Sequence, residues 1–197
     1  MDMDMRNNGG GDLDGFIGHM DGILEQVSNE GRAKFACAMD SLADFLNTNA
    51  ETISVNGSID GLIVLMANNI SSGNFIMLQH RVRNDDDKDF VISEIKRMTS
   101  SNSYDVVFTI AEAWAATYGR DKPVVRPSEH PQRREVVVTT CTLNLNFIPC
   151  VITAVQPIHR KKDGPFIDNS ECEFSVSTGK AISGKLTGYE KNICPLV

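Results

Sequence analysis

The segment EVVVTTCTLNL, residues 135–145, constrains the fold of this chain more than any other stretch of its sequence. Valine and threonine dominate it, and β-branched side chains favour the extended backbone of a strand. Residues 105–115, 150–158 and 171–178 also show the alternation of side chains that is typical of strands. The NFIP segment is short enough to join strand 135–145 to strand 150–158 as a hairpin. We therefore expect a mostly antiparallel sheet in the second half of the chain.

The first half of the chain has its apolar residues at helical spacing instead. The first helix carries its apolar face from Phe16 to Val27 and is expected to end near Gly31, and Ser58 is placed to cap a later helix. Residues 74–83 fit neither period, so a short strand and a helix both remain open there. The other predicted helices span residues 33–48, 59–70 and 89–98.

Helices followed by strands are the signature of the α+β class. We expect an α+β fold in which an N-terminal helical layer covers a mostly antiparallel sheet of about four strands. Residues 1–13 are acidic and Gly-rich, offer little apolar surface to bury, and are expected to be disordered. Residues 14–197 are expected to form a single domain, with a helical part over 14–100 and a sheet part over 104–190.

Charge and cysteine content narrow the class of protein. The net charge of −7 argues against a general nucleic-acid coat, although it leaves room for a local basic patch. No apolar signal segment starts the chain, and its apolar runs are too short to cross a bilayer. The five cysteines form no CxxC pair, so neither a zinc site nor a disulfide framework is indicated. We expect a protein of a reducing cytoplasm, with no membrane segment, metal or cofactor.

A longer pattern runs over residues 104–162, where a strand ends in EAW, a loop contains PSxHPxRxE, and two strands follow. This pattern resembles one in small proteins of bacteriophages and prophages. The resemblance leaves out the N-terminal helices. It implies a phage or prophage origin, a host cytoplasm as the location, and an order of strands, but no reaction. The matching residues are Glu112, Ala113, Trp114, Pro127, Ser128, His130, Pro131, Arg133 and Glu135.

The loop over residues 119–134 gathers positive charge in an otherwise acidic chain. A hairpin places the end of strand 150–158 beside the start of strand 135–145, so the basic residues after Ile158 are expected at the same edge of the sheet. This edge is the candidate site for an anion or an acidic partner. Its candidate residues are Arg126, His130, Arg133, Arg134, His159, Arg160 and Lys161.

Three interpretations of this edge remain open. The arginines are a solvated surface that contacts nearby carboxylates and carbonyls, or they bind an anion or acidic partner, or they take part in catalysis. Glu112 shares a strand face with Trp114, and a partly buried carboxylate needs a partner, so an ion pair with Arg133 or Arg134 is predicted. Glu112 and His130 would otherwise form an acid–base pair, but no nucleophile, metal set or phosphate loop accompanies them, and no catalytic residue is assigned.

The leading functional hypothesis is a non-enzymatic phage or prophage protein that binds another macromolecule, either a host protein or an assembly partner. The alternative is a small enzyme, or a binder of nucleotides or nucleic acid, that uses the basic edge with Glu112 and His130. The predicted helices 33–48 and 59–70 offer more apolar surface than a short sheet covers. We therefore expect a homo-oligomer, most simply a two-fold dimer.

Overall fold

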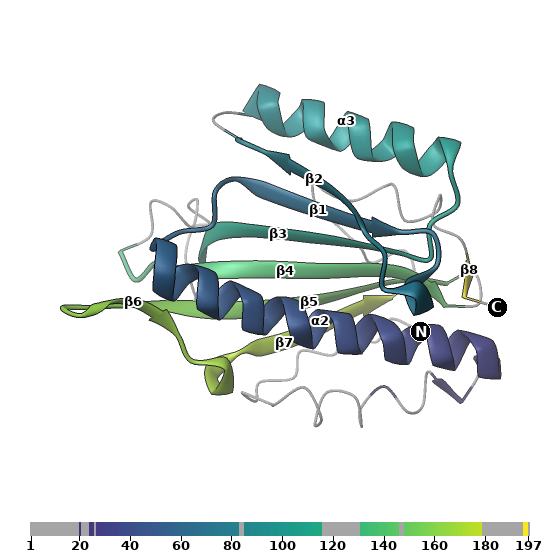
Figure 1. The fold of residues 1–197 in the computed structure, drawn as a ribbon, viewed down its shortest axis with the longest axis horizontal. Helices are drawn as coiled ribbons and strands as arrows, with labels where there is room; N and C mark the ends of the chain where they lie inside the picture. The colour runs from purple at the N-terminus through teal and green to yellow at the C-terminus, as the bar shows by residue number, and fades with distance from the viewer. Residues whose placement is uncertain are drawn as a thin grey trace, which may run out of the picture.

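The computed structural model describes residues 20, 24–25, 27–82, 85–115, 131–145, 148–178 and 195–196. They form an eight-stranded sheet with one long helix packed on one face and another helix on the other (Figure 1). The helices are α2 (Asn29–Asn56) and α3 (Asp85–Ser101), with short 3-10 helices η1 (Ile70–Ser72) and η3 (Asn169–Glu171). The strands are β1 (Leu62–Ala67), β2 (Ile76–His80), β3 (Val106–Ala115), β4 (Arg134–Leu145), β5 (Ile148–Lys161), β6 (Gly164–Ile167), β7 (Glu173–Thr178) and β8 (Pro195–Leu196).

The sheet has the strand order β2-β1-β3-β4-β5-β6, while β7 also pairs with β5 and β8 pairs with β4. Every pairing is antiparallel except that of β8 with β4. The α+β class is confirmed, but the sheet has more strands than the four expected. The division into a helical part 14–100 and a sheet part 104–190 does not hold, because β1 and β2 lie in the first part and α3 separates them from β3.

Helix α2 contains the predicted helix 33–48 and extends beyond it at both ends. The Ser28 side chain caps its start by accepting the backbone N–H of Gly31, and Gly57 ends it in a left-handed conformation with φ 79°. Gly31 therefore lies in the first turn of α2. The expectation that it ends an earlier helix is wrong. The face from Phe16 to Val27 falls largely outside the described residues, and so does the tail 1–13.

The predicted helix 59–70 is wrong, and half of it is strand β1. The run LIVLMA satisfies helical spacing because it is apolar at nearly every position. A strand covered on both faces produces the same continuous run. Alternate residues of β1 reach the two sides of the sheet. Leu62, Val64 and Met66 pack in the cluster that contains α3, and Ile63, Leu65 and Ala67 pack in or against the cluster that contains α2.

The remaining predicted elements agree with the structure apart from their ends. The open segment 74–83 contains strand β2, and the predicted helix 89–98 lies inside α3, which already begins at Asp85. The four predicted strands correspond to β3, β4, β5 and β7. Strand β6 was not predicted, because its four residues are too few to show an alternation.

A buried network of amides fixes α2 on the sheet. Asn49 donates to Thr139 Oγ1 at 3.0 Å and to Gln156 Oε1 at 2.9 Å. The Gln156 amide then donates to the backbone oxygen of Leu46 and to the side chain of Asn169. Because buried polar groups are costly when unpaired, these bonds favour one position of the helix over β4 and β5.

Candidate functional site

Three strands bring the candidate residues to one border of the sheet. β3 ends there at Ala115, which is paired with Arg134 at the start of β4, and Val136 is paired with Pro157 near the end of β5. We call this border the loop end of the sheet, and it comprises residues 114–115, 133–135, 157–161 and 164–166. Of the predicted binding residues, it brings together Arg133, Arg134, His159, Arg160 and Lys161. Arg126 and His130 lie outside the described residues.

Carboxylates lie against the basic side chains of the loop end. Arg134 Nη2 is 2.5 Å from Glu173 of β7, and Arg160 Nε is 2.5 Å from Glu135 of β4. The imidazole of His159 lies 3.1 Å from the Glu171 carboxylate. The two arginine contacts each balance a positive side chain with a negative one, and the His159 contact links β5 to η3. The loop end is therefore a surface of mixed charge and not a positively charged groove.

Aromatic rings support the other two cations. The guanidinium carbon of Arg133 lies 4.6 Å from the ring centroid of Trp114, and Lys161 Nζ lies 4.3 Å from that of Phe166. The His159 ring also stacks on Phe166 at a centroid distance of 5.0 Å. A cation over an aromatic face is attracted by the ring quadrupole. Trp114 remains 40% exposed, although tryptophan is highly buried on average.

Glu112 has a different partner from the one predicted. Its carboxylate accepts the backbone N–H of Ile59, at the start of the segment that leads into β1. Glu112 is paired with Val137, and Arg134 lies three residues away on β4, so alternation turns Arg134 to the other face of the sheet. Arg133 lies over the Trp114 ring instead. The structure therefore corrects the predicted ion pair of Glu112 with Arg133 or Arg134.

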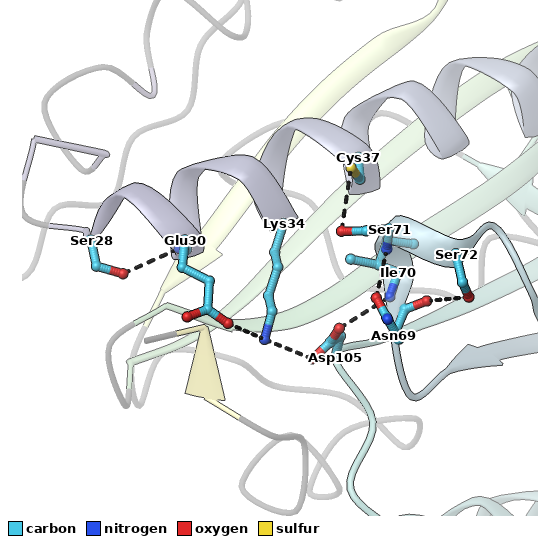
Figure 2. Close-up of polar contacts among 10 residues, drawn as sticks. Ser28, Glu30, Lys34, Cys37, Asn69, Ile70, Ser71, Ser72 and Asp105 are labelled. Carbon is cyan, nitrogen blue, oxygen red and sulfur yellow. Dashed lines mark hydrogen bonds and ion pairs between the residues drawn. The ribbon is translucent and has the colours of Figure 1, made fainter.

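A second polar cluster lies where α2, η1 and the start of β3 meet (Figure 2). Lys34 Nζ is 3.3 Å from Asp105 Oδ1 and 3.3 Å from Glu30 Oε1, and the other Asp105 oxygen accepts the N–H of Ile70 at 3.0 Å. Burial lowers the pKa of Lys34, but the attraction and hydrogen bond of Asp105, helped by Glu30, leave that pKa raised above its ordinary value. Both Asp105 oxygens are used in linking elements, so we interpret the cluster as structural.

Sequence reasoning missed this cluster, because Lys34 and Asp105 are 71 residues apart and neither belongs to a motif. It also missed the acidic partners of the loop end. Glu171 and Glu173 belong to the predicted strand 171–178, but the sequence does not say that this strand pairs with β5. Glu135 could have been recognised as an acidic partner, because it directly follows the two arginines and starts the predicted strand 135–145.

The cysteines and acidic groups offer little chemistry. The thiols of Cys37, Cys141, Cys150 and Cys172 are free. Burial raises the pKa of Cys150 and of Cys172 to about 12, which keeps both protonated and unreactive at neutral pH. Within the described part of the chain, no group of three or more His, Cys, Asp or Glu side chains is arranged to hold a metal ion.

None of the described helices is long and apolar enough to span a membrane.

Comparison of the chain with family models, with curated proteins and with solved structures found no match. The functional interpretation therefore rests on the residues and contacts of the loop end.

Proposed function

We propose that this chain is a non-enzymatic binding protein that recognises another protein through the loop end of its sheet. The phage or prophage resemblance of residues 104–162 suggests the setting, which is the cytoplasm of a bacterial host. The partner is then a host protein or a component of a phage assembly. The recognition surface is centred on Trp114 and Arg133.

The composition of the loop end carries this proposal. A site for phosphate needs donors that are free to contact it, whereas Arg134 and Arg160 already contact Glu173 and Glu135. A protein-contact surface typically has an exposed aromatic residue and arginine at its centre and paired charges around them. The stacked pair of Trp114 and Arg133, beside the ion pair of Glu135 and Arg160, fits the second description.

The residues of the phage-like pattern also support the loop end as the contact surface. Trp114, from the EAW triplet, is directly paired with Glu135, which closes the PSxHPxRxE motif. Arg133 of the same motif lies over the Trp114 ring. The pattern therefore brings three side chains from two strands to one place. A motif that served only to turn the chain would not require an exposed tryptophan.

Capture of a partner by a single-residue variant tests the proposal. The tagged chain is incubated with an extract of infected or lysogenic host cells, and bound proteins are identified. We expect Trp114→Ala to lose at least about tenfold of the captured partner, because truncating a central aromatic residue typically costs more than 1.4 kcal/mol of binding. Asp40→Ala is the control, since Asp40 is exposed in the middle of α2 and belongs neither to the loop end nor to β2. Equal capture by both variants, with unchanged melting temperatures, would exclude the loop end as the contact surface.

A further inference from the structure

Strand β2 is the last strand on one side of the sheet. Within the described part of the chain it pairs only with β1, so its outer edge presents backbone donors and acceptors that another strand can bind. We propose that β2 is where this chain pairs with a second copy of itself, strand against strand, to make a dimer. This contact is separate from the loop end and does not depend on the function proposed for it.

The exposed apolar side chains point to β2 as a contact surface. Ile76 and Met77 of β2 are 45% and 61% exposed, and Phe90 of α3 is 55% exposed. Phe90 stacks on His80 of β2 with a centroid distance of 5.4 Å, so all three apolar residues belong to the same border. Edge strands that remain unpaired usually carry lysine, proline or a bulge, and the sequence IMLQH has neither lysine nor proline.

The occupant that fits this edge best is a second copy. Residues 76–80 contain no aspartate, glutamate, lysine or arginine, so a two-fold related copy brings no like charges together along the strand. This matters for a chain with a net charge of −7, whose copies repel each other over most of their surface. An antiparallel pairing of two identical strands also satisfies both free edges at once.

The length of β2 sets the register of the pairing. A two-fold axis through the middle residue, Leu78, is the arrangement that pairs all five residues of both strands. It places Ile76 opposite His80 of the partner subunit and Met77 opposite Gln79 of the partner subunit. Ile76 then lies beside the His80–Phe90 stack of the other copy, where apolar and aromatic surfaces meet.

This contact replaces the earlier basis for expecting an oligomer. The expectation of an oligomer relied in part on apolar surface of a helix over residues 59–70, but this segment contains β1, whose two faces are covered by α2 and α3. The exposed apolar surface lies one strand further out, on β2.

Light scattering on the purified full-length chain at micromolar concentration tests the proposal. We expect a mass of about twice 21.7 kDa for the native chain and a monomer mass for Met77→Lys, since a charge on an edge strand blocks pairing. Val55→Lys is the control, because Val55 is 82% exposed on α2 and should leave the dimer intact. Unchanged circular dichroism shows that the variants fold.

A second substitution tests the register. Gln79→Glu added to Met77→Lys creates two opposite-charge pairs across the two-fold axis, so the double variant should regain the dimer mass. A monomeric native chain, or a dimer that survives Met77→Lys, overturns the proposed contact. A double variant that stays monomeric overturns the register centred on Leu78.

Discussion

The carboxylates of Glu135, Glu171 and Glu173 make the loop end a surface of mixed charge. Both side chains of the Arg134–Glu173 pair are about half exposed, at 43% and 51%, and such pairs contribute at most about 1 kcal/mol to stability. In the proposed recognition of a partner, Glu135 and Glu173 offset the two arginines, and Trp114 is left as the most exposed large apolar side chain of this border. Only a partner that matches mixed charge and an aromatic face fits such a surface.

Glu112 stabilises the fold by accepting a hydrogen bond from the segment that leads into β1. Replacing it by alanine leaves the Ile59 N–H without its acceptor, and we expect the free energy of unfolding to fall by about 1–3 kcal/mol. Glu112→Gln keeps a carbonyl oxygen at the same distance and should lose less. Urea unfolding of the three proteins measures both differences.

Arg134→Ala is the matched comparison for Glu112. It should cost less than about 1 kcal/mol, and its effect should add to that of Glu112→Ala, because the two side chains lie on opposite faces of the sheet. A strong interaction energy between these two substitutions would mean that they form the ion pair first expected from the sequence.

At the scale of the elements, the strands with mixed polarity were predictable and β1 was not. Residues 135–145 are rich in valine and threonine, whose β-branched side chains favour a strand. The run LIVLMA satisfies strand and helix alike, and the choice depends on α3, a helix later in the chain that covers its second face. Gly61, one residue before β1, was a usable signal, since a helix has no need of a glycine there.

The candidate site was also predictable only in part. The hairpin of β4 and β5 is local, so the approach of Arg134 and His159 followed from it. The acidic partners Glu171 and Glu173 belong to η3 and β7, and pairing of β7 with β5 is a tertiary feature that no local pattern encodes. The sequence therefore predicted that Arg134 and His159 lie at one border of the sheet, but not which carboxylates contact them.

Gly61 and Gly73 provide a matched test of how β1 and β2 are joined. Both have positive φ, at 84° and 66°, so alanine costs about 1–2 kcal/mol of conformational strain at either position. A Cβ at Gly61 would also lie 2.3 Å from the backbone oxygen of His80, whereas nothing lies within 4 Å at Gly73. We expect Gly61→Ala to lower the free energy of unfolding by about 3 kcal/mol or more, and Gly73→Ala by about 1 kcal/mol. Equal losses in urea unfolding would show that β2 does not approach Gly61 so closely.

At the scale of the whole molecule, the loop end and the edge strand β2 are two separate surfaces of one sheet. The loop end lies where β3, β4 and β5 meet, and β2 forms a lateral border of the same sheet (Figure 1). Helix α2 packs on one face of the sheet, over β3, β4 and β5, and α3 packs on the other face, against β1 and its neighbours β2 and β3. A dimer through β2 would therefore leave both loop ends accessible, and a partner could be bound by each copy.

Whether the loop end recognises protein or phosphate is decided most directly by melting the chain with nucleotides and short oligonucleotides. We expect no rise in Tm with any of them, because Arg134 and Arg160 are already paired with carboxylates. A true ligand at 100 times its Kd would add about 2.7 kcal/mol, which is roughly 5–10 °C for a chain of this size. A rise of that size that disappears in Arg134→Ala or Arg160→Ala would contradict the proposed function and identify the loop end as an anion site.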